Sequence, residues 1–237
     1  MMQIPDDYIE LERIYAATLA RDVRSLAVVS TCPCEGVSTV IKALARRNLI
    51  AGHSTLLVDL NLHSPNLGTL FNLEALPART AQLSSPHSLA LSEIDTKLAL
   101  VTGPADRRSI VTLREPGSLE KHIENWLNDY DSVLIDTSPI SLNNSGNLPG
   151  ERAAGACDGA ILTVLAGQTT ETAITNTVDK LKLANALLLG CVINDQFNPT
   201  LKSELLREVK RIDRFLPKLA AKFRSWIYKN YLLNLEV

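Results

Sequence analysis

The stretch LAVVSTCPCEGVSTVIKALARRNLIAGHSTLLVDL, residues 26–60, decides the fold of the chain. It begins with an apolar run at 26–29, typical of a buried strand, and a short loop follows. The next segment has helical spacing of its apolar residues and ends at Gly52, and a second apolar run at 56–58 stops at Asp59. A strand, a loop, a helix and a strand in this order predict two parallel strands joined by a helical crossover.

The loop between the first strand and the helix has the form of a phosphate-binding loop. In such loops, backbone N–H groups and the helix N-terminus surround the phosphates, a lysine reaches the outer phosphates, and Ser or Thr holds Mg²⁺. Gly36 and Ser38 stand at the expected positions, whereas the lysine position holds Val37 and an earlier glycine is replaced by Cys34. The candidate nucleotide-binding residues are Cys34, Glu35, Gly36, Val37, Ser38 and Thr39.

Carboxylates end two of the predicted strands. Asp59 follows the run at 56–58, and Asp136 ends the apolar run at 132–136. A carboxylate at the C-terminal end of a strand, downstream of a phosphate loop, orients Mg²⁺ or its waters. We therefore take Ser38, Asp59 and Asp136 as candidate Mg²⁺ ligands, and Asp59 and Asp136 as the catalytic residues if the protein is active. The structural alternative for each carboxylate is a cap on a turn at the strand end.

Length and composition are those of a soluble α/β domain. The chain has 237 residues, 46% hydrophobic and 21% charged, and its net charge of −2 gives no reason to expect nucleic-acid binding. Nothing approaches the roughly 18 consecutive apolar residues of a membrane-spanning helix. The acidic N-terminus lacks the apolar core of a secretory signal, so we expect a cytoplasmic protein whose 4 cysteines stay reduced.

Strands and helices alternate along the rest of the chain. Apolar runs predict strands at 98–101, 160–165 and 189–193, and helices are predicted at 118–129 and 170–187. This pattern predicts an α/β fold with a mainly parallel sheet and helices on both faces. The other predicted segments are an amphipathic helix at 6–21, a short helix at 67–71, and exposed loops at 78–88 and 143–155.

The end of the chain differs in composition, which predicts a helical tail at 200–237 after an α/β domain at 1–199. Basic residues alternate there with apolar and aromatic ones, and Pro217 is expected to divide the tail into two helices. A basic amphipathic helix with aromatic residues can lie on an anionic membrane or dock on an acidic partner. The alternative is a last helix that packs its apolar side on the domain and turns its basic side to water.

Four segments of the chain match the motifs of one family in order and spacing. They are the loop at 30–39, the segment LLVDLNLHSPNLGTLF at 56–71, the segment YDSVLIDTSP at 130–139, and the segment CDGAILTVLAGQTT at 157–170. Together they resemble the cytoplasmic P-loop domain of bacterial tyrosine kinases (BY-kinases) of capsule and exopolysaccharide synthesis, in the MinD/ParA-like group. The resemblance implies a P-loop NTPase fold, ATP or ADP with Mg²⁺ as ligands, and an inner-membrane polysaccharide co-polymerase or another export protein as partner.

Three departures from the family pattern change what the resemblance implies. Val37 cannot supply the positive charge of the loop lysine. The family's oligomerisation motif, E-x-x-R-x-x-R, keeps only its first two charged residues, Glu10 and Arg13. The tyrosine-rich tail of the family is reduced to Tyr228 and Tyr231 within a basic and apolar stretch.

Three hypotheses follow from these residues. The first is a regulator or scaffold of exopolysaccharide synthesis and export with weak or no ATP hydrolysis. The second is an active ATPase or tyrosine kinase whose loop is compensated by a basic residue from elsewhere, such as another subunit of a homo-oligomer. The third is a peripheral protein of the inner membrane face that resembles MinD-type ATPases and binds anionic lipid through the tail at 201–233.

Overall fold

The computed structural model describes residues 4–5, 8–71, 83–91, 94–142, 144–196, 201–213 and 217–230. The chain divides into two compact units, Met1–Asn194 and Asp195–Val237. The boundary predicted after residue 199 falls at 197–200, outside the described residues.

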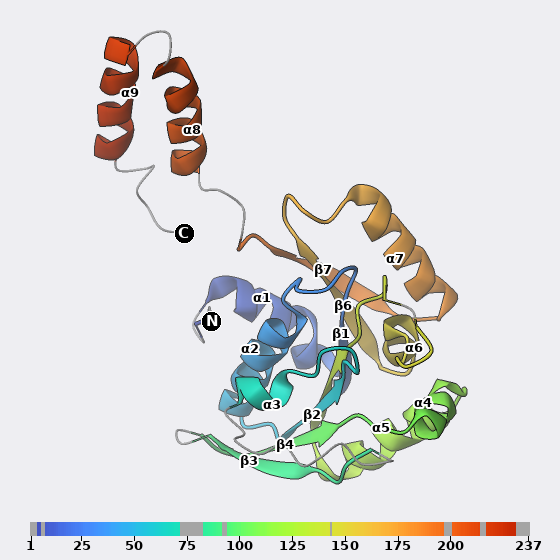
Figure 1. Cartoon of the computed structure of the whole chain (residues 1–237). Helices are drawn as coiled ribbons and strands as arrows, with labels where there is room; N and C mark the ends of the chain where they lie inside the picture. Colours follow the sequence, from blue (N-terminus) through green and yellow to red (C-terminus); the bar gives the residue numbers. More distant parts are fainter. Residues whose placement is uncertain are drawn as a thin grey trace. The chain divides into compact units, whose positions relative to one another are not determined.

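A seven-stranded sheet in the order β3-β4-β2-β5-β1-β6-β7 forms the centre of the first unit (Figure 1). Neighbouring strands are parallel, except that β3 runs antiparallel to β4. This confirms the predicted mainly parallel sheet. The strands are β1 (Ser25–Ser30), β2 (Thr55–Leu60), β3 (His87–Leu91), β4 (Ile94–Thr102), β5 (Ser132–Thr137), β6 (Gly159–Leu165) and β7 (Leu188–Asn194).

Helices cover both faces of the sheet, as predicted. Helices α1, α2 and α3 pack with one set of strand side chains, whereas α4, α5, α6 and α7 pack with the opposite set. The seven helices of this unit are α1 (Ile9–Ala17), α2 (Val37–Ile50), α3 (Leu67–Leu70), α4 (Arg107–Arg114), α5 (Ser118–Asp129), α6 (Gly150–Gly155) and α7 (Glu171–Leu183). A short 3₁₀ turn, Leu19–Arg21, follows α1.

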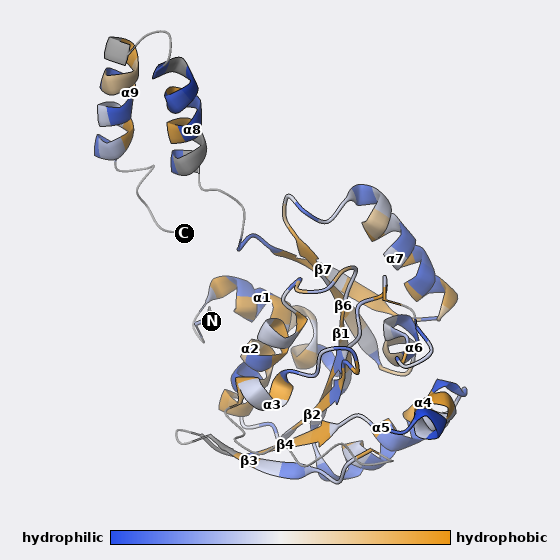
Figure 2. Ribbon diagram, viewed as in Figure 1, coloured by the Kyte–Doolittle hydropathy of each residue, from blue (hydrophilic) through white to orange (hydrophobic). Residues whose placement is uncertain are grey.

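The central strands are buried on both faces. Every residue of β1, β2 and β5 is buried, and Figure 2 shows orange, hydrophobic segments in the middle of the sheet beside blue, hydrophilic ones. Alternate side chains of a strand point to opposite faces, so a strand covered on both sides must be apolar throughout. This is why continuous apolar runs, rather than alternating ones, marked these strands in the sequence.

The structure corrects the predicted loop at 143–155, because α6 lies within it. Its asparagine, glycine and proline content is typical of a loop, yet Ala153 and Ala154 are buried in the core. Gly150 starts the helix where a side chain has no room, since a Cβ there would lie 2.5 Å from the Ser138 carbonyl oxygen. The prediction of an exposed loop holds for 144–146, whereas at Gly150 the loop-like composition reflects close packing.

Two elements of the first unit were not predicted. Strand β3 overlaps the loop predicted at 78–88, of which 78–82 lie outside the described residues. Helix α4 begins after Asp106, whose carboxylate accepts a hydrogen bond from the Ser109 N–H at 3.0 Å. This Asp-x-x-Ser cap was a usable signal for a helix start.

The second unit is a pair of helices, α8 (Leu201–Asp213) and α9 (Pro217–Lys229). Proline is favoured in the first turn of a helix, and Pro217 begins α9, which confirms that it separates two helices. Val209 of α8 and Ala220 and Ile227 of α9 form a small buried cluster between them. In the described part of the chain, no helix has the length and apolar character needed to cross a membrane.

Candidate phosphate-loop site

The loop at 31–36 connects the end of β1 to the start of α2. Gly36 caps the helix with φ of 99°, a conformation that favours glycine. A Cβ at Gly36 would lie 2.7 Å from Nδ2 of Asn194, so the Asn194 side chain would have to move. Cys34, at the position of a family glycine, has φ of 64° and is exposed. Cys34 therefore adopts a left-handed backbone conformation that glycine adopts more readily.

The carboxylate of Glu35 is buried and bonds to the protein itself. Its Oε2 accepts hydrogen bonds from the N–H of Thr31 at 2.7 Å and of Cys32 at 3.0 Å. Its Oε1 accepts a hydrogen bond from the Thr169 hydroxyl, and its backbone carbonyl accepts one from Asn194 Nδ2 at 3.2 Å. These contacts show that the Glu35 side chain holds the loop in shape. The nucleotide-binding role predicted for Glu35 stays a prediction.

We expect Glu35→Ala to lower the free energy of unfolding by about 2–3 kcal/mol, because it leaves buried N–H donors without an acceptor. The measurement is urea unfolding followed by circular dichroism. Glu171→Ala, at an exposed glutamate in the first turn of α7, is the matched control and should change stability by less than about 0.5 kcal/mol. Equal effects of the two substitutions would contradict the role given to Glu35.

The side chain of Val37 is 8% exposed and belongs to the apolar core. The nearby cations on α2 are engaged elsewhere. Lys42 Nζ donates to the Leu70 carbonyl oxygen at 2.8 Å, and Arg47 forms a salt bridge with Glu12 of α1. Neither of these two cations therefore takes the place of the missing loop lysine in this arrangement.

The structure brings Ser38, Asp59 and Asp136 together. Asp59 of β2 and Asp136 of β5 are register partners on neighbouring parallel strands, and both are buried. The Ser38 hydroxyl donates to Oδ2 of Asp136 at 2.5 Å. Burial and the neighbouring Asp59 carboxylate raise the pKa of Asp136 well above its ordinary value, and the Ser38 hydrogen bond opposes this only in part.

Asp59 also holds the segment that follows β2. Its Oδ2 accepts hydrogen bonds from the N–H groups of Asn66 and Leu67, each at 3.1 Å, and its Oδ1 accepts one from the N–H of Asn61 at 3.2 Å. These bonds cap the start of α3, which is the structural alternative that the sequence left open. Of the two carboxylates, Asp136 therefore has more free acceptor capacity.

The oxygen atoms of this cluster suit Mg²⁺, which prefers hydroxyl, carboxylate and water ligands. Oδ1 of Asp136 is buried and has no hydrogen-bond partner among the described residues, as expected of an atom that faces an ion or its water. The Thr102 hydroxyl, beside Asp59 in the sheet register, is likewise buried without a partner. Thr102 was not predicted, and its one signal was its place at a strand end before Gly103.

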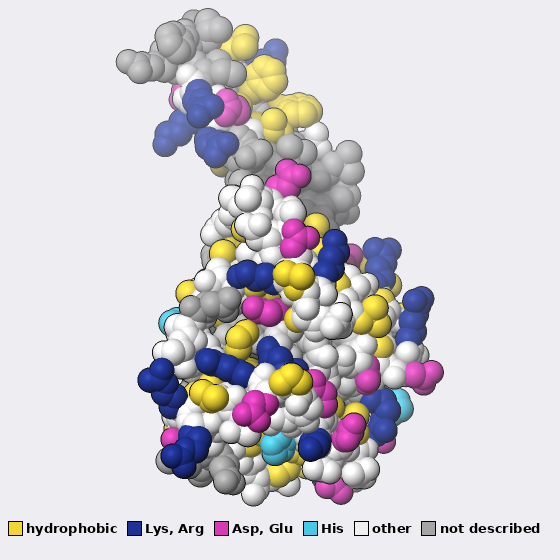
Figure 3. All heavy atoms as spheres, turned by 90° about the vertical axis from the view of Figure 1, so that its right-hand side faces the viewer, with side chains coloured by type: hydrophobic (Ala, Val, Ile, Leu, Met, Phe, Trp, Pro, Cys, Tyr) yellow, Lys and Arg dark blue, Asp and Glu magenta, His cyan; other side chains and the backbone are white. Residues whose placement is uncertain are grey.

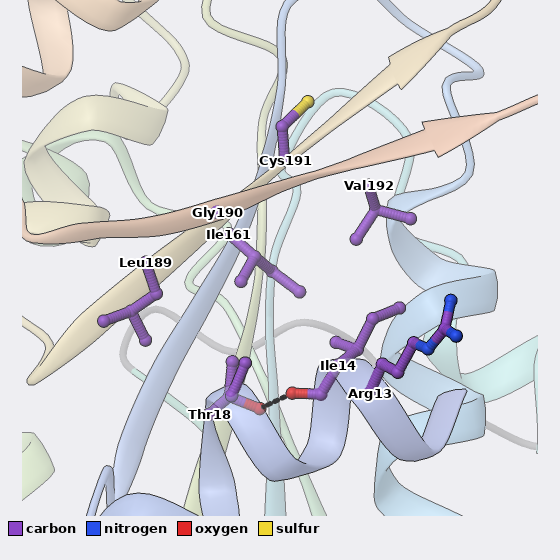
Figure 4. Close-up of a pocket in the computed structure, with 9 residues that line it drawn as sticks. Arg13, Ile14, Thr18, Ile161, Leu189, Gly190, Cys191 and Val192 are labelled. Atoms are coloured by element: carbon purple, nitrogen blue, oxygen red, sulfur yellow. Dashed lines mark hydrogen bonds between the residues drawn. The ribbon is translucent and has the colours of Figure 1, made fainter. Parts of the chain in front are cut away.

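A shallow apolar hollow of about 170 Å³ lies between α1 and strands β6 and β7 (Figure 4). Ile14, Ile161 and Leu189 point into it, whereas Cys191 points away. None of its lining residues belongs to the phosphate loop. Arg13 and Thr18 also line it, but the Thr18 hydroxyl already donates to the Ile14 carbonyl oxygen at 2.7 Å. Specific ligand sites combine apolar walls with several convergent polar groups, and one arginine is not such a set, so we assign no ligand to the hollow.

Comparisons with known proteins agree with the architecture of the sheet and its helices. No protein-family model matches the chain. The chain is 27% identical over 190 residues to the tyrosine-protein kinase YwqD of Bacillus subtilis (strain 168), covering 75% of each protein. It is 26% identical over 193 residues to the tyrosine-protein kinase CpsD of Streptococcus agalactiae, covering 80% of this chain and 82% of that kinase. The homologues of this chain are bacterial tyrosine kinases.

Solved structures place this tyrosine-kinase homologue in the P-loop fold. It is similar to the BceF tyrosine kinase domain with a TM-score of 0.60 and 19% identity, covering 78% of this chain and 74% of that one. It is also similar to the septum site-determining protein MinD of Pyrococcus horikoshii, solved with Mg-ADP, with a TM-score of 0.57 and 19% identity over 74% and 72% of the two chains. At these identities the similarity establishes the fold, which is the predicted MinD/ParA-like one.

Proposed function

We propose that this tyrosine-kinase homologue is a regulator or scaffold of bacterial capsule or exopolysaccharide synthesis and export, with weak or no ATP hydrolysis. The observation that carries the proposal is Val37, which occupies the lysine position and packs into the apolar core. Lys42 and Arg47 are engaged by Leu70 and Glu12, so the loop lacks their charge as well. A phosphate loop without a cation should bind and polarise a triphosphate poorly.

The partner of this scaffold is an inner-membrane polysaccharide co-polymerase or another protein of the export system. Resemblance to the bacterial tyrosine kinases supports this assignment. The protein would act in the cytoplasm, peripherally at the inner membrane face, where the basic tail at 201–233 favours anionic lipid. Residues 214–216 and 231–233 of this tail lie outside the described residues.

A second candidate function, an active ATPase or tyrosine kinase, is favoured by the cluster of Ser38, Asp59 and Asp136. Oδ1 of Asp136 is free to face Mg²⁺ or its water, and Ser38 and Asp136 would be its ligands. Backbone N–H groups at 34–39 would surround the phosphates of ATP or ADP. This function needs a cation from outside the loop, for which a second copy of the chain is the proposed source.

Calorimetric titration of the full chain with ATP and ADP, with and without Mg²⁺, tests the proposal. We expect no saturation below millimolar nucleotide, and phosphate release no faster than that of Asp136→Ala. Micromolar binding together with hydrolysis that Asp136→Ala abolishes would contradict the scaffold and establish the second candidate.

A further inference from the structure

The α8–α9 pair uses only part of its apolar surface to hold itself together. Val209, Ala220 and Ile227 form the buried cluster, and Leu205 and Leu206 of α8 pack against it. The Arg224 guanidinium adds a hydrogen-bonded salt bridge to Asp213 at 3.0 Å, which links the two helices. The Lys202 ammonium of α8, 5.2 Å from the centre of the Tyr228 ring of α9, adds a further contact between the described residues of the two helices.

A second apolar group on α9 lies outside the buried cluster that the described residues form. Leu219, Phe223 and Trp226 are 51%, 51% and 55% exposed. They are spaced four and three residues apart, so their side chains follow one face of the helix. We call these three residues the α9 stripe. Figure 3 shows hydrophobic side chains gathered along one side of the second unit.

Basic side chains accompany the stripe. Lys222 and Lys229 are exposed on α9, and Arg207, Lys210 and Arg211 are exposed on α8. Residues 201–237 contain nine Lys or Arg and four Asp or Glu, a formal charge of +5, whereas residues 1–200 carry 15 and 22, a charge of −7. An exposed apolar stripe beside lysines is the arrangement of a helix that lies in a membrane interface, because lysine stems extend along the apolar surface towards lipid phosphates.

We propose that the α9 stripe inserts into the surface of an anionic lipid bilayer, with α8 holding α9 in place. Charge argues against the α8–α9 pair of a second copy as the occupant, since that pair carries the same positive charge. The inference rests on the peripheral membrane location proposed above and deepens it, because it names the side chains that enter the lipid; the scaffold function and its export partner are tested separately by nucleotide titration. The proposal narrows the lipid contact from the whole tail at 201–233 to the three side chains of the α9 stripe. It does not depend on whether the phosphate loop binds nucleotide.

The test is sedimentation of the full chain with vesicles of phosphatidylcholine alone or mixed with phosphatidylglycerol. We expect binding only to the anionic vesicles, weakened by salt, and at least tenfold weaker binding by Phe223→Ser/Trp226→Ser. Tyr228→Ser is the matched control: Tyr228 is 57% exposed on the same helix but interacts with Lys202 of α8, and its loss should leave binding within about threefold. Circular dichroism and gel filtration check that each variant keeps its fold and oligomeric state.

A fluorescence measurement separates insertion from surface attraction. The chain has two tryptophans, so Trp126→Phe leaves Trp226 as the reporter. We expect its emission to shift to the blue with anionic vesicles and to be quenched by brominated lipid. The proposal is overturned if the wild-type chain ignores anionic vesicles at low salt, or if Phe223→Ser/Trp226→Ser binds as the wild type does. It is also overturned if that variant turns a wild-type dimer into a monomer, which would make a second copy the occupant.

Discussion

Val37→Lys is expected to bind MgATP at least tenfold more tightly than the wild-type chain. The substitution returns an ammonium group to the loop, where a charge pair near 4 Å contributes on the order of 4 kcal/mol at an effective dielectric constant of 20, before desolvation. Val37 is buried at the edge of the core, and the stem of a lysine can follow the apolar surface while its ammonium group reaches the loop. Calorimetry with MgATP measures the gain.

Val37→Met is the control for this experiment, because methionine adds length without charge. It should leave nucleotide binding at the wild-type level, so that any difference between the lysine and methionine variants reports the charge. Equal, weak binding by both variants would mean that another feature of the loop, such as the side chain of Cys34, closes the site. Micromolar binding by the wild-type chain itself would mean that the loop never needed the lysine.

Asp136→Asn is expected to raise the free energy of unfolding by about 1–3 kcal/mol at pH 8 in the absence of Mg²⁺. Burial and the Asp59 carboxylate raise the pKa of Asp136 above its ordinary value of 3.8, so the folded chain holds the proton more tightly than the unfolded chain. The resulting stability is complete below that ordinary value and is lost as the pH rises through the raised pKa. Asparagine carries no charge, and its side-chain oxygen can still accept the Ser38 hydrogen bond.

Urea unfolding at several pH values between 4 and 8 measures this effect, and the gap between variant and wild type should widen with pH. Asp179→Asn, at an exposed carboxylate of α7, serves as the control and should show no such trend. Millimolar Mg²⁺ should stabilise the wild-type chain alone if the ion binds this cluster. A variant that is less stable than the wild type at pH 8, with a gap independent of pH, would contradict the prediction.

The sequence predicted the strands that are buried on both faces of the sheet. Continuous apolar runs identified β1, β2 and β5, because both faces of these strands are covered. It did not predict β3, an edge strand that joins the sheet only by pairing with β4. It did not predict helix α6 either, because a glycine required for close packing, such as Gly150, cannot be told from a turn glycine in the sequence.

The candidate site was predicted by residue type and spacing, but not by the direction of its side chains. Spacing along the chain placed Ser38, Asp59 and Asp136 correctly at one end of the sheet. It could not reveal that Glu35 faces Thr31 and Thr169, since these bonds depend on the packing of distant segments. The roles of Ser38, Asp59 and Asp136 towards a nucleotide or Mg²⁺ remain predictions.

The contacts of Glu35 bear on how this chain could have diverged from its relatives. Thr169 belongs to the segment after β6 and Asn194 ends β7, so the neighbouring strands hold the loop in shape. A loop that folds around its own carboxylate does not require a bound phosphate to stay folded. The fold of this loop therefore does not depend on a charged residue at position 37, and valine there is compatible with it.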